Sequence, residues 1–304
     1  MNKIVIVGGT GFLGFHVAKH FLKKKFKIIS VSRYKPKKIR KLSKVKYLFA
    51  DISQKKKLIK VLKPHLNSKY VVNVGGEIDH TQNSKVHKSH FTGVKNLTNI
   101  FKNANIKRFI QIGSSMEYGK SKSPQLENYR AKPISVYGKS KFLATNYLIK
   151  MYKERNFPSL IVRPYQIYGP AQEENRLVPF LISQSLNGNY FPCSDGNQFR
   201  DFLYILDFVN CIDLLIRKKI KLGQIFNVGN GKGIKVKKVI NLVNKKIKTG
   251  KPVFNQIKLR KEEQKYLFPS ILKIKKTVGW TPKTKLNIGI NKTIRFYRNK
   301  KKWK

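Results

Sequence analysis

The sequence predicts an α/β fold, with a doubly wound parallel sheet followed by a small C-terminal α/β lobe. Apolar runs typical of buried strands alternate with stretches of helical periodicity as far as residue 170. The first of these strands leads straight into a glycine-rich turn that opens a helix. Beyond residue 170 the strands are short. We therefore expect a main domain at 1–170 and a lobe at 171–304, from which some segments return to the main sheet.

The elements of the main domain follow from its apolar runs. The expected strands, in order, are 3–9, 26–33, 45–51, 69–76, 107–115 and 158–169. Helical spacing of apolar residues predicts helices at 12–25, 84–105 and 135–155. In the lobe we expect helices at 176–187, 205–217 and 235–248, with short strands at 188–193 and 223–229. The crossovers between parallel strands should be right-handed.

The composition is strongly basic, with 66 Lys and Arg against 14 Asp and Glu and a net charge of +52 over 304 residues. Such a charge attracts anionic ligands. The lysines are spread along the chain together with many Ile, Asn, Phe and Tyr, whose codons are AT-rich, so a compositional bias of the genome explains the charge without specific nucleic-acid binding. Cys193 and Cys211 form neither a disulfide framework nor a metal motif. Without a signal peptide or an apolar run long enough to span a membrane, we expect a cytoplasmic protein.

The glycine-rich turn reads "GGTGFLG" at 8–14 and lies between a strand and a helix. Glycines let the backbone approach a pyrophosphate, and the helix N-terminus supplies free N–H groups. The spacing Gly8-x-x-Gly11-x-x-Gly14 resembles that of the short-chain dehydrogenase/reductase superfamily, which implies a Rossmann-like fold. The residues expected to bind the dinucleotide here are Gly8, Thr10, Gly11, Phe12, Leu13 and Gly14.

The end of the second strand bears on the choice between NADP and NAD. An acidic residue about 20 residues after the turn normally holds the ribose 2′-hydroxyl. Ser32 stands in that place and Arg33 follows it. Because Ser and Arg would accept a 2′-phosphate that an acid repels, NADP is favoured over NAD. Asp51 and Ile52, after the third strand, resemble the superfamily's adenine contact, although Asp51 could instead cap the next helix.

A catalytic set is suggested by "SVYGKSK" at 135–141, where Tyr137 lies four residues before Lys141 on an expected helix. This spacing alone means little in a lysine-rich chain. Ser114, in "IGSSMEYG", ends the fifth strand, and "RPYQIYGP" at 163–170 and "RDFLYILD" at 200–207 follow in order. Together these motifs resemble the extended short-chain dehydrogenases, the NAD(P)-dependent epimerase/dehydratase family that modifies nucleotide sugars.

The resemblance implies that Ser114, Tyr137 and Lys141 are catalytic. A free tyrosine has a pKa of about 10, and the charges of Lys141 and an oxidised nicotinamide would favour its phenolate. Tyr137 would then move a proton while hydride is exchanged at the nicotinamide. Lys141 can also hold the nicotinamide ribose, and Pro164 is expected to border the cofactor.

The reaction within the family is narrowed by residues 115–117. Sugar-nucleotide 4,6-dehydratases resemble "STDEVYG", and Ser115 and Met116 stand where their acidic pair belongs. Glu117 comes one residue late and in an extended segment would point away. Met116 and Arg176 likewise replace the Cys and His of GDP-fucose synthases. We therefore expect a reductase of a 4-keto-6-deoxy nucleotide sugar, with a nucleotide-sugar 4-epimerase as the alternative.

Several further expectations follow from the same resemblance. The candidate substrate-binding residues are Ser115, Gln166, Arg176 and Arg200, the two arginines being suited to a diphosphate. Relatives commonly form homodimers through two helices, here 84–105 and 135–155. A non-catalytic polyanion-binding protein remains a rival class, but it would not need the set of Ser114, Tyr137 and Lys141.

Overall fold

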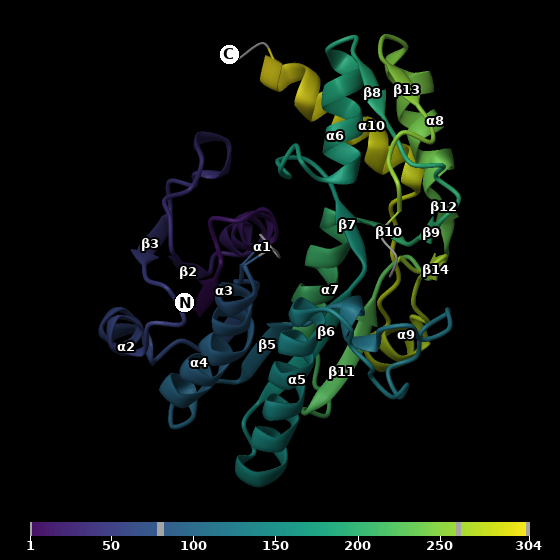
Figure 1. Ribbon diagram of the computed structural model, residues 1–304. Coiled ribbons are helices and arrows are strands. Elements are labelled where there is room, and N and C mark those ends of the chain that lie inside the picture. The colour runs from purple at the N-terminus through teal and green to yellow at the C-terminus, as the bar shows by residue number, and fades with distance from the viewer. Residues whose placement is uncertain (1, 78–81, 260–262, 302–304) are drawn as a thin grey trace.

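The computed structural model describes residues 2–77, 82–259 and 263–301. Its centre is a seven-stranded sheet with the order β11-β6-β5-β4-β1-β2-β3, and every neighbouring pair of strands is parallel (Figure 1). The strands are β1 (Lys3–Val7), β2 (Lys27–Ser32), β3 (Val45–Phe49), β4 (Tyr70–Asn73), β5 (Arg108–Ile112), β6 (Ser159–Pro164) and β11 (Gln224–Val228). This confirms the predicted α/β class with a doubly wound parallel sheet.

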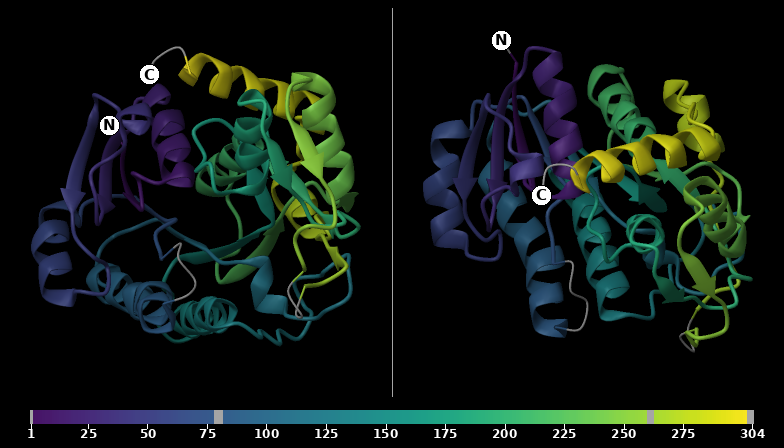
Figure 2. Two further views of the ribbon diagram at one scale, coloured as in Figure 1. Left: turned by 45° about the horizontal axis from the view of Figure 1, so that its top comes forward. Right: turned by 90° about the horizontal axis from the view of Figure 1, so that it is seen from above.

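Helices cover both faces of the sheet (Figure 2). Helices α1 (Phe12–Lys23) and α7 (Ile205–Arg217) share one face, and α2 (Lys55–Leu62), α4 (Gly93–Phe101) and α5 (Val136–Arg155) share the other. Side chains alternate across a strand, so Ile4 and Ile6 pack in the first of these cores while Val5 and Val7 pack in the second. Burial on both faces explains why the strands read as continuous apolar runs.

The remaining elements form the lobe and its connections. The lobe holds helices α6 (Leu177–Leu186), α8 (Val236–Ile247), α9 (Leu272–Val278) and α10 (Leu286–Lys301). Its short strands are β7 (Gln166–Tyr168), β8 (Tyr190–Pro192), β9 (Phe199–Arg200), β10 (Phe202–Tyr204), β12 (Ile234–Lys235), β13 (Lys251–Val253) and β14 (Tyr266–Leu267), which pair as β10-β7, β12-β9-β14 and β13-β8. Short helical turns complete the chain at η1 (Lys38–Arg40), η2 (Lys63–His65), α3 (Asn83–His87), η3 (Lys88–Thr92) and η4 (Ser115–Tyr118).

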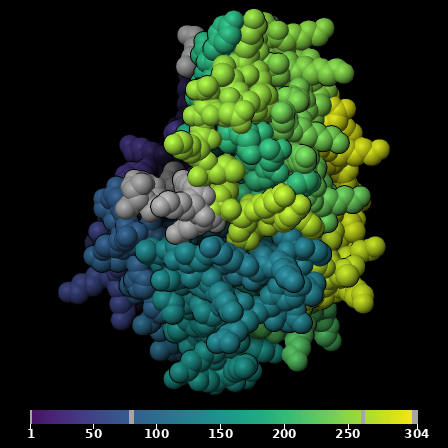
Figure 3. All heavy atoms as spheres, turned by 45° about the vertical axis from the view of Figure 1, so that its right-hand side comes forward, coloured from purple at the N-terminus to yellow at the C-terminus, as the bar shows by residue number. Residues whose placement is uncertain are grey.

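The lobe is tied to the main domain by a strap. The yellow-green segment after residue 262 lies against the blue-teal segment that follows β5 (Figure 3). Backbone hydrogen bonds join Gln125 N–H to Phe268 O at 2.9 Å and Ser270 N–H to Gln125 O at 2.8 Å. Leu267, from the same segment, lines the pocket described below.

The structure adds detail to the predicted elements. The strand expected at 158–169 breaks at Tyr165, because Tyr165 N–H bonds Val228 O while Gln166 N–H turns to Asp201 O. The helix expected at 84–105 is interrupted by the π-helical turn η3. Some segments of 171–304 were expected to return to the main sheet, and two can now be named. The short strand expected at 223–229 is β11, an edge strand of the main sheet, and the helix expected at 205–217 is α7, which packs beside α1.

Among the described residues, no helix is both long enough and apolar enough to cross a membrane.

Candidate functional site

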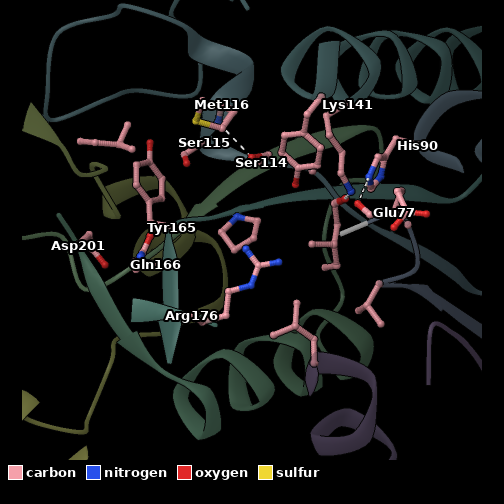
Figure 4. Close-up of a pocket in the computed structure, with 18 of the residues that line it drawn as sticks. Glu77, His90, Ser114, Ser115, Met116, Lys141, Tyr165, Gln166, Arg176 and Asp201 are labelled. Atoms are coloured by element: carbon pink, nitrogen blue, oxygen red, sulfur yellow. Dashed lines mark hydrogen bonds between the residues drawn. The ribbon is translucent and has the colours of Figure 1, made fainter. Parts of the chain in front are cut away.

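A cavity of about 360 Å³ lies beyond the carboxyl ends of β1, β4, β5 and β6. This is where ligands bind in open parallel sheets. It brings together all of the predicted catalytic and substrate residues, from segments far apart in the sequence (Figure 4). The predicted residues that line it are Leu13, Ser114, Ser115, Tyr137, Lys141, Pro164, Gln166, Arg176 and Arg200.

Tyr137 and Lys141 are placed by the first turns of α5. Ser135 caps this helix by accepting the N–H of Gly138 at 3.1 Å. A Cβ on Gly138 would lie 2.6 Å from the carbonyl oxygen of Met116, so only glycine lets α5 approach the cavity this closely. The Nζ of Lys141 lies 5.8 Å from the centre of the Tyr137 ring and donates to Ile112 O at 2.7 Å. The two side chains therefore meet, as the i, i+4 spacing predicts.

The surroundings shift the pKa values of both groups. Burial raises the pKa of Tyr137 above its ordinary value, and a hydrogen bond with Ser114 opposes this rise. Burial lowers the pKa of Lys141 to about 8, although the carboxylate of Glu117 acts in the other direction. Proton transfer at the Tyr137 hydroxyl near neutral pH therefore needs additional positive charge close to the phenol.

Ser114 is held in place by a buried acid. It is the N-cap of η4, and its N–H donates to Glu117 Oε1 at 2.8 Å. The other oxygen of Glu117 accepts two bonds from Arg163, at 2.9 and 2.7 Å, and one from Thr145 at 2.8 Å. The expectation that Glu117 points away from the reacting position is thus met, but in a 3₁₀ turn rather than an extended segment. Glu117 fixes the strand end that carries Ser114.

The predicted dinucleotide cradle has the required shape. A Cβ on Gly14 would lie 2.2 Å from Gly8 O, so α1 packs against the turn only with glycine at this position. No side chain caps the N-terminus of α1, which leaves its first N–H groups for an anion. Thr10 donates its N–H to Ser32 Oγ at 3.2 Å, and the Phe12 side chain is buried in the core. The N–H of Gly11 closes the turn on Gly8 O at 3.0 Å and that of Gly8 bonds Val31 O at 2.7 Å, so the part of the turn that fits a dinucleotide pyrophosphate is the start of α1.

The Arg33 guanidinium already forms an ion pair with an acid. Its Nη1 donates to Glu77 Oε2 at 2.8 Å, so a 2′-phosphate would have to compete with a carboxylate. Asp51 accepts from the N–H and hydroxyl of Ser53, at 2.8 and 2.7 Å. It shapes the turn before α2 and does not cap that helix, whose N-cap is Gln54. Ile52 is buried, and its carbonyl oxygen accepts from Asn96 Nδ2 at 2.9 Å.

The candidate substrate residues differ in their exposure and in the bonds that their side chains already make. Arg176 enters the cavity from the wall opposite Ser114, and the Gln166 side chain is exposed (Figure 4). Arg200 is buried and already bonds Glu263 and, at 2.7 Å, the carbonyl of Phe199. A substrate diphosphate would therefore meet Arg176 directly, but Arg200 only by displacing Glu263.

Glu77, His90 and Asp201 also line the pocket and were not predicted. Glu77 follows the glycines after β4, and its position at a strand end is the signal that could have revealed it. His90, on η3, packs edge-on against the Tyr137 ring with centroids 5.0 Å apart and donates from Nε2 to Glu77 O at 3.0 Å. Asp201 accepts the backbone N–H groups of residues 230–232, at 2.7, 2.7 and 3.3 Å, and so anchors the lobe. Among the described side chains, no His, Cys, Asp and Glu cluster could hold a metal ion.

The sequence model of the "NAD dependent epimerase/dehydratase family" matches residues 4–229. The "Uncharacterized UDP-glucose epimerase YtcB" of Bacillus subtilis is 26% identical over 97% of this chain and 97% of its own length. The dTDP-D-glucose 4,6-dehydratase of Dictyostelium discoideum is 28% identical over 80% of this chain. The match spans 62% of that dehydratase and 59% of its human and bovine counterparts.

The fold is also that of solved structures. The UDP-glucose 4-epimerase of Thermotoga maritima, crystallised with UDP-glucose, superposes with a TM-score of 0.92. It is 23% identical, and the superposition covers 98% of this chain and 99% of that one. At this level of identity the likeness confirms the Rossmann-like architecture.

Proposed function

Because this chain belongs to the NAD-dependent epimerase/dehydratase family, we propose that it exchanges a hydride between a nicotinamide dinucleotide and C4 of a nucleotide sugar, acting as a 4-epimerase. The observation that carries the proposal is the content of the cavity. Tyr137 and Ser114 form one acid–base set, and Met116 stands where an eliminating acid would be needed. Of the two carboxylates among the described lining residues, Glu77 is paired with Arg33 and Asp201 is saturated by backbone N–H groups.

Tyr137 carries the proton in this mechanism. When the sugar is oxidised at C4, its O4 proton passes to the Tyr137 oxygen, and Ser114 donates a hydrogen bond to the same sugar oxygen. The chemistry that a nicotinamide would supply when bound here is reversible hydride exchange with C4. Epimerisation requires the 4-keto sugar to turn over within the cavity before the hydride comes back to its other face. Tyr137 then gives the proton back, so that no further acid or base is consumed.

Lys141 prepares Tyr137 for this role. In the protonated state its charge favours the phenolate, and its hydrogen bond to the Ile112 carbonyl holds it beside the Tyr137 ring. Arg176 is placed to bind the diphosphate of the nucleotide sugar, and Gln166 to donate to the sugar or base. Leu13 and Pro164 border the space left for the nicotinamide ribose.

The second candidate is the reduction of a 4-keto-6-deoxy nucleotide sugar, which uses the same residues. A preference for NADP would suit a reductase, because a reductase consumes its reduced cofactor. The sequence argument for NADP rested on Ser32 and Arg33. Pairing of Arg33 with Glu77 weakens that argument. Similarity along nearly the full length to proteins named as UDP-glucose epimerases also favours epimerisation. A 4,6-dehydratase is not favoured, because Met116 stands where that reaction needs an acid.

The test is to incubate the purified protein with UDP-glucose or UDP-galactose and NAD, and in parallel with 4-keto-6-deoxy nucleotide sugars and NADH or NADPH. The proposal expects interconversion of the C4 epimers without net change in nicotinamide absorbance. Tyr137→Phe should abolish this conversion while the dinucleotide still binds. Stoichiometric oxidation of the reduced cofactor by a keto sugar would establish the reductase instead, and activity in neither assay would contradict both.

We also propose that the protein forms a homodimer through α4 and α5. Leu143 on the outer side of α5 is 41% exposed, and Phe91 and Tyr147 lie next to each other, partly exposed, with ring centroids 6.4 Å apart. A dimer would remove this apolar surface from water. Light scattering should give twice the chain mass, and Leu143→Glu should give a monomer. A monomeric native protein would contradict the proposal.

A further inference from the structure

The Arg33–Glu77 ion pair lies at the end of the sheet that is expected to hold the dinucleotide. Strands lie in the order β4-β1-β2, so Glu77 after β4 and Arg33 after β2 stand on either side of the glycine-rich turn that ends β1. Their contact of 2.8 Å joins side chains that are 30% exposed for Arg33 and 11% exposed for Glu77. The pair therefore belongs to the cofactor site and not to an open surface.

Glu77 is held in position by its own backbone. Its N–H donates to Ser89 Oγ at 3.0 Å, and its carbonyl oxygen accepts from His90 Nε2 at 3.0 Å. Both partners lie on the π-helical turn η3, a kind of irregularity often found at functional sites. With the backbone clamped at both groups, the carboxylate is directed toward Arg33 before any ligand arrives.

The charges around Arg33 are unfavourable to a phosphate. Burial lowers the pKa of Arg33, but Glu77, and with it Tyr34 and Asp51, outweigh burial and raise it. Asp51 adds a weaker negative charge to that of Glu77. The Ser32 Oγ accepts the N–H of Thr10 and carries no charge. A 2′-phosphate bound to the Arg33 guanidinium would have to displace or closely approach the Glu77 carboxylate, which like-charge repulsion opposes.

We propose that Glu77 is the residue that sets cofactor specificity in this chain, occupying Arg33 so that the site takes NAD and rejects the 2′-phosphate of NADP. Discrimination then comes from the loop after β4, since the acid expected after β2 is absent. This inference rests on the proposed dinucleotide-dependent function. It makes Arg33 a conditional ligand, which can bind a 2′-phosphate only when Glu77 is neutral.

The experiment measures binding and does not depend on turnover. The dissociation constants for NADH and NADPH are obtained from nicotinamide fluorescence with the full chain, for the wild type, Glu77→Gln, Arg33→Met and the double variant. Glu154→Gln is the matched control, because it removes one carboxylate from the exposed outer side of α5. Circular dichroism of each variant confirms that it is folded.

We expect the effect of the Arg33 substitution on NADPH binding to depend on whether Glu77 is present. Wild type should bind NADH more tightly than NADPH, and Glu77→Gln should tighten NADPH by about tenfold or more while NADH changes little. Arg33→Met should barely affect NADPH in the wild type but should cancel the gain in Glu77→Gln. An NADPH preference in wild type, or an unchanged ratio in Glu77→Gln, would overturn this inference alone. Failure to bind either dinucleotide would overturn the proposed function as well.

Discussion

Removing Arg163 should cost the fold more than most single substitutions, because it leaves a buried acid without its cation. Glu117 is fully buried, and Arg163 supplies two of its four hydrogen bonds, at 2.9 and 2.7 Å. Arg163→Met would retain only the bonds from Ser114 N–H and the Thr145 hydroxyl. Breaking one side of a buried ion pair costs about 3–5 kcal/mol. Arg163 also stacks on the Tyr118 ring at 4.5 Å, which adds to the loss.

The assay is urea unfolding at neutral pH, followed by circular dichroism. Arg163→Met should lower the free energy of unfolding by about 4 kcal/mol, a large part of the total stability of an ordinary domain. Adding Glu117→Gln to Arg163→Met should recover at least about half of this loss, because the amide oxygen still accepts Ser114 N–H without a buried charge. The reasoning is refuted if the single variant stays within about 1 kcal/mol of wild type, or if the double variant is no more stable than the single one.

Three further predictions concern the site. Lys141→Met should be inactive yet more stable than wild type at pH 7 by about 2 kcal/mol. Removing the buried ammonium, whose pKa is lowered to about 8, should stabilise the fold by about 3 kcal/mol, and losing its hydrogen bond to Ile112 O should take back about 1 kcal/mol. The unfolded state binds the Lys141 proton more tightly, so this advantage should shrink as pH rises from about 8 toward 10.5, which urea unfolding across that range measures. Arg176→Met should raise the KM for the nucleotide sugar by about tenfold and leave kcat within a factor of about three, as steady-state kinetics would record; an equal fall in kcat would place Arg176 in the chemical step. Gly138→Ala should lower both stability and kcat, because its Cβ would press on the Met116 carbonyl at 2.6 Å, and a variant with native Tm and kcat would contradict the tight packing of α5.

The parts of the fold that sequence could predict are those set by local periodicity. The six long apolar runs and the turn at 8–14 mark the sheet and its cofactor end, because buried parallel strands and helix N-termini have local signatures. The place of β11 was harder to see. Its five residues resemble any short strand, and only the hydrogen bonds to β6 put it at the edge of the main sheet. The break at Tyr165 likewise depends on distant partners, Val228 and Asp201.

The acids that pair with the candidate arginines could not be predicted, for a related reason. Arg33 and Arg200 each read as an anion ligand, yet Glu77 and Glu263 already bind them. With 66 Lys and Arg against 14 Asp and Glu, a given acid has several cations within reach, and sequence does not say which one it takes. Ser114, Tyr137 and Lys141 were predicted from the order of the family motifs, since the i, i+4 spacing alone says little in a lysine-rich chain, and the structure brings all three to one pocket at the edge of the sheet.

The central claim is that hydride leaves and returns at the sugar C4 beside Tyr137. Its most direct test uses UDP-glucose carrying deuterium at C4, incubated with the full chain and NAD, and follows the products by nuclear magnetic resonance. The proposed mechanism predicts UDP-galactose that retains deuterium at C4, because the same deuteride comes back to the opposite face. It predicts no product with Tyr137→Phe. Product with protium at C4, or conversion that survives Tyr137→Phe, would contradict it.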